Sequence, residues 1–140
     1  MQSFISHSEK QTIAFAKKFA KTLKAGSVVA LEGNLGSGKT IFIKGIALGL
    51  GLKDPDEVKS PTFAIMHVYP TTPKLYHFDL YRFENPKEAA AIGFEEFTSD
   101  PETISCIEWP DRASALIPSS AIRLHLEVAG EHSRKIRFPI

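Results

Sequence analysis

The chain has 140 residues, which predicts one domain over residues 1–140, and 43% of them are hydrophobic, enough for a buried core. The 17 Lys and Arg residues nearly balance the 16 Asp and Glu residues, which excludes a global electrostatic attraction to nucleic acids or acidic membranes. A single cysteine, Cys106, excludes an intrachain disulfide, and neither a signal peptide nor a membrane-length apolar run is visible, so we expect a cytoplasmic protein without a membrane contact.

The first part of the chain predicts a helix, a strand, a second helix and a loop. Residues 8–25 have the apolar spacing of an amphipathic helix, with a capping box that begins at Ser8. An apolar run between glycines at 27–33 is typical of a buried parallel strand, and 39–51 predicts a helix that ends in glycines. Residues 52–62 contain many charges and two prolines, which predicts an exposed loop.

The second part of the chain predicts two hairpins separated by a helix and an apolar strand. In chain order, these are a hairpin of 63–70 and 74–82, a helix at 85–97, a strand at 103–110 and a hairpin of 121–129 and 133–140. Hairpins are antiparallel, whereas buried apolar runs are typical of parallel strands. We therefore expect an α/β fold with a mixed sheet that is parallel at its centre.

The strongest motif is GNLGSGKT at 33–40, which matches the P-loop pattern G-x-x-x-x-G-K-[ST]. It follows an apolar strand and opens a helix, which is the context that a P-loop requires. Its glycines let backbone N–H groups converge on phosphate oxygens, and the helix N-terminus adds positive potential. Lys39 would add a charge near the β- and γ-phosphates, and the Thr40 hydroxyl is a ligand for Mg²⁺.

The P-loop pattern also predicts which residues surround the phosphates. These are Gly33, Asn34, Leu35, Gly36, Ser37, Gly38, Lys39 and Thr40. The pattern indicates a nucleoside triphosphate or its diphosphate, but it fixes neither the base nor the reaction. Together with the predicted elements, it favours a P-loop NTPase-like three-layer sandwich, with helices on both faces of the sheet.

A P-loop protein needs a second acidic residue to position Mg²⁺, usually at the end of an apolar strand. Two segments qualify, because LYHFD ends in Asp79 and ISCIE ends in Glu108. Glu108 is favoured, since its strand is the more apolar one and is expected beside the P-loop strand. Asp79 lies on a hairpin strand whose alternation is typical of a surface strand, where a carboxylate could orient the attacking water or bind the metal through a water. Both carboxylates therefore stay candidates.

The segment SPTF at 60–63 is a further candidate for contact with the nucleotide. Pro61 holds Ser60 extended, and Thr62 follows a loop rich in acidic residues. A loop threonine often senses the γ-phosphate in nucleotide switches, although S-P-T is also a common turn.

Four motifs in this order resemble the TsaE family, the ATPase component of bacterial tRNA threonylcarbamoyladenosine biosynthesis. After the P-loop come SPTF at 60–63, HFDLYR at 77–82 and IEWP at 107–110, and the resemblance covers roughly residues 5–138. The pair HFDLYR and IEWP is far more specific than the P-loop.

The resemblance implies an ATPase that uses Mg²⁺ and hydrolyses ATP slowly when alone. It further implies TsaB and TsaD as partners, in a complex where TsaD installs the threonylcarbamoyl group on adenosine 37 of tRNAs that read codons starting with A. The tRNA contact would be indirect, through the complex. We expect a monomer when the protein is alone.

The resemblance also assigns roles to residues that match the family's motifs. The expected Mg²⁺ ligands are Thr40 and Glu108, and the expected catalytic residues are Lys39, Thr62, Asp79 and Glu108. A first switch corresponds to Ser60, Pro61 and Thr62, and a second to His77, Asp79, Tyr81 and Arg82. We expect His77 to orient switch residues rather than act as a general base. The nucleotide is further expected to contact Ser8, Thr12, Trp109 and Arg134.

Other nucleotide-binding classes fit the sequence less well. A small GTPase needs an N-K-x-D motif, and neither Asn34 nor Asn85 starts one. A free-standing kinase of a small metabolite is the main alternative, but such kinases carry an arginine-bearing lid, and no insertion of that length is visible. A binding module whose release is timed by hydrolysis overlaps with the family interpretation.

Overall fold

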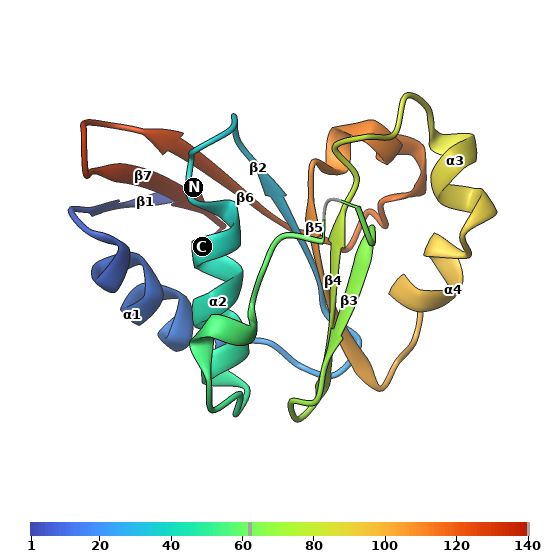
Figure 1. Cartoon of the computed structure of the whole chain (residues 1–140), viewed down its shortest axis with the longest axis horizontal. Coiled ribbons are helices and arrows are strands. Elements are labelled where there is room, and N and C mark those ends of the chain that lie inside the picture. Colours follow the sequence, from blue (N-terminus) through green and yellow to red (C-terminus); the bar gives the residue numbers. More distant parts are fainter. Residues whose placement is uncertain (62, 140) are drawn as a thin grey trace.

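One sheet crosses the middle of the molecule, in a computed structural model that describes residues 1–61 and 63–139 (Figure 1). In this part of the chain the sheet has seven strands, in the order β1-β7-β6-β2-β5-β4-β3. The strands are β1 (Gln2–Ser6), β2 (Val28–Glu32), β3 (Met66–Tyr69), β4 (Lys74–Asp79), β5 (Thr103–Glu108), β6 (Ile122–Val128) and β7 (Arg134–Phe138).

The sheet is parallel at its centre and antiparallel at its margins. Strand β2 pairs in parallel with β5 and β6, and β4 pairs in parallel with β5. Strand β3 is antiparallel to β4, and β7 is antiparallel to β6. The predicted mixed sheet and both predicted hairpins are therefore confirmed.

Helices cover both faces of the sheet, which confirms the three-layer α/β arrangement (Figure 1). The helices are α1 (Glu9–Ala20), α2 (Lys39–Gly49), α3 (Pro86–Ala91) and α4 (Phe94–Thr98), with 3₁₀ helices η1 (Pro55–Glu57) and η2 (Pro110–Leu116). One hydrophobic core lies under α1 and α2, and the other lies under α3, α4 and η2. No helix of the described residues is both long enough and apolar enough to cross a membrane.

Helix α1 is shorter than the 8–25 that the sequence predicts. The Ser8 hydroxyl caps its start by accepting a hydrogen bond from the Gln11 backbone N–H at 3.1 Å, as expected. At the other end, the backbone N–H groups of Lys21, Thr22 and Leu23 each bond to the carbonyl three residues earlier. These tighter turns end the α-helical ladder at Ala20, before the predicted end at residue 25.

The predicted helix at 85–97 is two short helices rather than one. Asn85 caps α3, and its side chain accepts from the Lys87 backbone N–H at 3.0 Å. Gly93 then adopts a left-handed conformation, with φ 79°, which breaks the helix. The break turns α4 so that Phe94 packs edge-to-face against Phe78 of β4, with ring centroids 5.0 Å apart.

Strand β1 was not predicted from the sequence. Its residues pair antiparallel with β7, with Phe4 opposite Ile136, and Phe4 stacks on Phe15 of α1 at 4.6 Å between ring centroids. The pairing depends on a strand at the opposite end of the chain, so no local pattern reveals it. The expected exposed loop at 52–62 is also only partly exposed, because Leu52 and Val58 are buried in the core.

Strand β4 is not the surface strand that its alternation suggested. It lies between β3 and β5, so both of its edges are paired, and its two faces are buried in the two hydrophobic cores, with Leu75 in one and Phe78 in the other. His77 and Asp79 are buried, at 0% and 5% exposure. The polar members of the pattern face the α2 side near the P-loop, while Phe78 and Leu80 join the core under α3 and α4.

Candidate nucleotide-binding site

The P-loop forms the turn between β2 and α2. Gly36 and Gly38 have φ values of 78° and 98°, in the left-handed region that residues with a side chain rarely adopt. Gly38 is the N-cap of α2, and its carbonyl accepts from the Phe42 backbone N–H at 2.9 Å. The turn therefore brings the positive end of the helix to the open side of the loop.

Two features of the loop fit a bound phosphate. The Ser37 hydroxyl is buried, yet it has no hydrogen-bond partner among the described residues, and Ser37 lines the adjacent pocket. A buried donor without a partner is costly, and a phosphate oxygen would satisfy it. A Cβ at Gly33 would lie 2.5 Å from both the Leu126 carbonyl oxygen and the Ser37 hydroxyl, so only glycine fits there.

Lys39 lies folded against the loop and against Trp109. Its ammonium group donates a hydrogen bond to the Gly33 carbonyl and lies 3.7 Å from the centroid of the Trp109 ring. Burial lowers the pKa of Lys39, and the charge of Glu108, followed by those of Asp79 and Asp111, opposes this shift. A poorly hydrated ammonium group would be stabilised by the negative charge of an anionic ligand.

Thr40, in the first turn of α2, contacts Glu108, at the end of β5. Strands β2 and β5 run side by side, with Leu31 opposite Glu108, so Glu108 ends beside the start of the P-loop. The Thr40 hydroxyl lies 3.0 and 3.1 Å from the two carboxylate oxygens of Glu108. A hydroxyl and a carboxylate are ligands that suit Mg²⁺, so these two residues could hold the ion together.

His77 lies directly behind Glu108. Its Nε2 atom is 2.6 Å from a Glu108 carboxylate oxygen, and its Nδ1 atom is 3.3 Å from the Tyr69 hydroxyl. The expectation that His77 orients other residues fits this placement, but its direct partner is Glu108. Tyr69 did not emerge from the sequence analysis, because it belongs to β3 and its contact with His77 depends on how the hairpin pairs.

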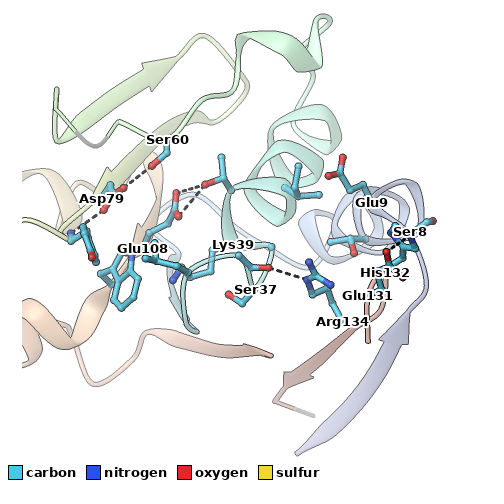
Figure 2. Close-up of a pocket in the computed structure, with 18 of the residues that line it drawn as sticks. Ser8, Glu9, Ser37, Lys39, Ser60, Asp79, Glu108, Glu131, His132 and Arg134 are labelled. Carbon is cyan, nitrogen blue, oxygen red and sulfur yellow. Dashed lines mark hydrogen bonds and ion pairs between the residues drawn. The ribbon is translucent and has the colours of Figure 1, made fainter. Parts of the chain in front are cut away.

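Asp79 lies next to Glu108 in the sheet register but has different partners. Its carboxylate accepts hydrogen bonds from the Ser60 hydroxyl at 2.6 Å and from the Tyr81 backbone N–H at 2.9 Å. The Tyr81 ring contacts the Trp109 ring at 4.8 Å between centroids. Asp79 therefore connects the segment at Ser60 with the segment that follows β4 (Figure 2).

Two other predicted switch residues have different positions. The Arg82 guanidinium lies over the Phe63 ring, 5.2 Å from its centroid, and Arg82 is not part of the pocket wall described below. Pro61 is buried and also stays outside that wall. Thr62 lies outside the described residues.

A pocket of about 870 Å³ joins these residues into one site (Figure 2). This volume suits a ligand of nucleotide size. Of the predicted residues, the pocket is lined by Ser8, Thr12, Leu35, Gly36, Ser37, Gly38, Lys39, Thr40, Ser60, Asp79, Tyr81, Glu108, Trp109 and Arg134. Gly33 and Asn34 do not line it, and His77 lies behind its wall.

The pocket extends from the P-loop to the start of α1 and the turn between β6 and β7. At this end the Arg134 side chain donates to the Gly36 carbonyl at 3.1 Å, and the Thr12 hydroxyl donates to the Ser6 hydroxyl at 2.7 Å. Residues that the sequence analysis missed complete this end: His7, Glu9, Ile41, Glu131 and His132. They belong to no motif, and only the sheet brings the two segments together.

Comparisons with known proteins agree with this architecture. The family model described as "Threonylcarbamoyl adenosine biosynthesis protein TsaE" matches residues 6–136. The chain is 36% identical over 132 residues to the tRNA threonylcarbamoyladenosine biosynthesis protein TsaE of Treponema pallidum, covering 94% of this chain and 96% of that one. It is 37% identical over 139 residues to the TsaE of Aquifex aeolicus, covering 99% and 96% of the two chains.

A solved structure shows the same fold. The crystal structure of Bacillus subtilis YdiB superimposes with a TM-score of 0.78 at 31% sequence identity, covering 98% of this chain and 83% of that one. The family match includes the P-loop and all the predicted switch residues, and it leaves only short segments at either end. The chain therefore belongs to the TsaE family of tRNA threonylcarbamoyladenosine biosynthesis.

Proposed function

We propose that this protein is a Mg²⁺-dependent ATPase that supports a TsaB–TsaD complex in forming threonylcarbamoyladenosine at position 37 of tRNAs that read codons starting with A. The observation that carries the ATPase proposal is the contact of Thr40 with Glu108 at 3.0 and 3.1 Å, beside the buried Ser37 hydroxyl, which has no hydrogen-bond partner among the described residues. The tRNA-modification role is supported by membership of the TsaE family. We place the protein in the cytoplasm.

The P-loop side of the pocket would hold the phosphates. The backbone N–H groups at the start of α2, the Ser37 hydroxyl and the Lys39 ammonium group would face the phosphate oxygens of a bound nucleotide. Thr40 and Glu108 would hold Mg²⁺, which neutralises phosphate charge during transfer to water. Lys39 must first leave the Gly33 carbonyl and the Trp109 ring, which favours slow turnover when the protein is alone.

Asp79 is proposed to orient the attacking water. Its carboxylate is held from two sides, by the Ser60 hydroxyl and the Tyr81 backbone N–H. An ionised carboxylate only accepts hydrogen bonds, so it is suited to orient a water molecule that donates one. Because Ser60 and Tyr81 belong to the two switch segments, a partner that moves either segment would also move this carboxylate.

Calorimetry with ATP, with and without Mg²⁺, tests the nucleotide proposal. We expect ATP to bind, Mg²⁺ to strengthen binding, and GTP to bind less well because no guanine-specific motif is present. Lys39→Ala should lose ATP affinity through a lost phosphate contact, and Glu108→Gln should lose the effect of Mg²⁺. Absence of ATP binding by the unmodified protein in the presence of Mg²⁺ would contradict the proposal.

Reconstitution tests the proposed partners. Mixing the protein with the matching TsaB and TsaD should permit repeated rounds of tRNA modification, and leaving it out should stop them. Unchanged cycles without this protein would refute the role. The alternative, a free-standing kinase of a small metabolite, predicts instead a phosphorylated metabolite without either partner.

A further inference from the structure

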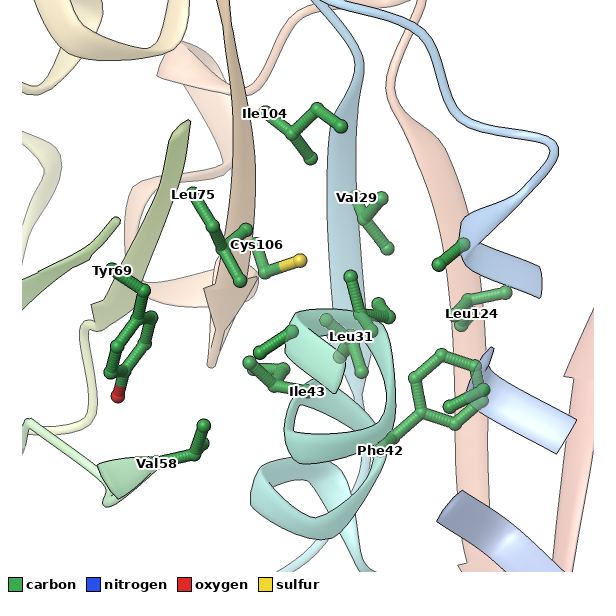
Figure 3. Packing of buried hydrophobic residues seen from close by; sticks show 14 of the residues in the cluster. Val29, Leu31, Phe42, Ile43, Val58, Tyr69, Leu75, Ile104, Cys106 and Leu124 are labelled. Carbon is green, nitrogen blue, oxygen red and sulfur yellow. The ribbon is translucent and has the colours of Figure 1, made fainter. Parts of the chain in front are cut away.

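Tyr69 places a buried hydroxyl between two parts of the site. The side chain is 5% exposed, and Figure 3 shows its ring beside the core with the hydroxyl on the side of Val58. This hydroxyl accepts a hydrogen bond from the Lys59 backbone N–H at 3.3 Å. It also lies 3.3 Å from the Lys59 carbonyl oxygen, 3.3 Å from His77 Nδ1 and 3.4 Å from His67 Nδ1. It thus joins the backbone next to Ser60 to the imidazole behind Glu108.

The contacts continue from His77 to Glu108. The imidazole is 0% exposed, and its Nε2 atom lies 2.6 Å from a Glu108 carboxylate oxygen. An ionised carboxylate only accepts hydrogen bonds, so this contact requires a proton on Nε2 whenever Glu108 is ionised. With Nε2 engaged by Glu108, Nδ1 is left for the Tyr69 hydroxyl, and the two contacts together set the orientation of the ring.

The protonation of the Tyr69 hydroxyl agrees with this arrangement. Burial raises the pKa of Tyr69, and the charges of Glu108 and Glu57 act in the same direction, whereas the hydrogen bond with the Lys59 backbone lowers it. Tyr69 therefore keeps its hydroxyl proton at neutral pH and can serve as both donor and acceptor.

We propose that Tyr69 is a positioning residue for Glu108, acting through His77 and linking the carboxylate to the backbone at Lys59. The proposal rests on the proposed function, because it takes Thr40 and Glu108 as the Mg²⁺ ligands. A carboxylate whose orientation is set before the metal arrives binds it more tightly. Through Tyr69 and His77, a movement of the backbone next to Ser60 would also change the position of Glu108. None of these contacts belongs to the P-loop motif.

Tyr69→Phe tests the proposal because it removes only the hydroxyl. We expect ADP affinity in EDTA to stay at the wild-type value, while the Mg²⁺ concentration needed to strengthen ADP binding rises about tenfold, as is typical for loss of a partner of a metal ligand. Tyr76→Phe is the matched control, since Tyr76 lies on the neighbouring strand and its hydroxyl has no hydrogen bond among the described residues. A Tyr69→Phe protein with the same Mg²⁺ dependence as Tyr76→Phe overturns the proposal.

Nuclear magnetic resonance of the histidine side chains provides a readout without nucleotide or metal. Long-range ¹H–¹⁵N correlation in the wild-type protein should show His77 protonated at Nε2, with an Nδ1 shift that changes in Tyr69→Phe and not in Tyr76→Phe. An unprotonated Nε2 overturns the proposed network. If Nε2 is protonated as expected but Mg²⁺ does not strengthen nucleotide binding in the wild type, the ATPase proposal fails, and the role of Tyr69 toward the metal fails with it.

Discussion

Asp79 and Glu108 are neighbours across β4 and β5, yet their surroundings give them different roles. Glu108 accepts hydrogen bonds from Thr40 and His77, which fixes it at the entrance to the P-loop. Asp79 instead accepts from Ser60 and from the backbone of Tyr81. The sequence left both carboxylates open as metal ligands, and the partner sets favour Glu108 for direct contact with Mg²⁺.

We expect Asp79→Asn to separate catalysis from binding. The change keeps the shape of the side chain but removes the charge that would orient water, so ATP affinity should stay unchanged. Phosphate release in the complex with TsaB and TsaD should fall about a hundredfold, as for the loss of a positioned acid–base group. Glu32→Gln is the control, because Glu32 also ends a central strand but pairs with Arg123 outside the pocket. Wild-type phosphate release by Asp79→Asn would contradict the role.

Trp109 can report the position of Lys39. It is the single tryptophan of the chain, and the Lys39 ammonium group lies 3.7 Å from its ring centroid. Trp109 itself has φ 58°, an uncommon conformation for a residue with a side chain, and its ring lies in the pocket wall.

We expect ATP to change the fluorescence emission of Trp109, because Lys39 must move from the ring to the phosphates. Lys39→Ala should alter the emission of the free protein and abolish the response to ATP. Lys44→Ala is the matched control, since Lys44 also lies on α2 but outside the pocket, and it should respond like the wild type. An unchanged emission on ATP binding, with binding verified by calorimetry, would contradict the movement.

At the scale of the elements, helices α1 and α2 approach each other closely at a glycine. A Cβ at Gly45 would lie 2.5 Å from the Ala16 Cβ and 2.7 Å from the Ile13 carbonyl oxygen. The carbonyl belongs to the backbone of α1 and cannot rotate away. Glycine at this position therefore lets α2, with its N-terminus at the nucleotide site, pack tightly on α1.

We expect Gly45→Ala to lower the free energy of unfolding. The overpacking cost of about 1–3 kcal/mol is only partly offset by the gain in helix propensity of about 1 kcal/mol, so a net loss of up to about 2 kcal/mol should appear in urea denaturation. Gly130→Ala is the control, because the nearest atom to its Cβ would be 3.5 Å away. A Gly45→Ala protein as stable as Gly130→Ala would show that the helices can separate without cost.

The elements also show where local patterns fail. The alternation in 75–83 predicted a surface strand. In the structure, β3 and β5 pair with the two edges of β4, and the two hydrophobic cores cover its two faces. Alternation indicates that the two faces of a strand differ in polarity, and here the polar face of β4 is directed toward the pocket instead of toward solvent. Likewise, the helical spacing of 85–97 continues across Gly93, where the packing of Phe94 on Phe78 decides the break.

At the scale of the whole molecule, Cys106 lies in the centre of the sheet. It is 0% exposed, on β5 between β2 and β4, and packs among the core residues under α2 (Figure 3). Burial raises the pKa of its thiol well above the usual range, and the charge of Glu108 adds to this shift. The thiolate is the reactive form, so the folded protein protects this side chain.

We expect the Cys106 thiol to react with a thiol reagent such as iodoacetamide only when the molecule unfolds. At pH 8 the native protein should be labelled very slowly, and the chain unfolded in urea should be labelled rapidly. ATP with Mg²⁺ should slow the labelling further, because a ligand that binds only the folded state lowers the unfolded fraction. Labelling of the native protein at the rate of the unfolded chain would contradict the buried position.

The sequence alone predicted the parts of this protein that lie within short segments. The P-loop, its flanking strand and helix, both hairpins and the mixed sheet all follow from local spacing and turn chemistry, and the four motifs pointed to the correct family. These features are local because a phosphate cradle and a hairpin are each formed by consecutive residues.

The tertiary structure decided which distant residues meet. Thr40 and Glu108 are 68 positions apart, His77 and Glu108 are 31 apart, and Tyr69 reaches His77 from the neighbouring strand. Strand β1 and the far end of the pocket likewise depend on pairing between the two ends of the chain. Such contacts are set by strand order and packing, which no single segment encodes, and they bring together the side chains on which the proposed metal and water positions depend.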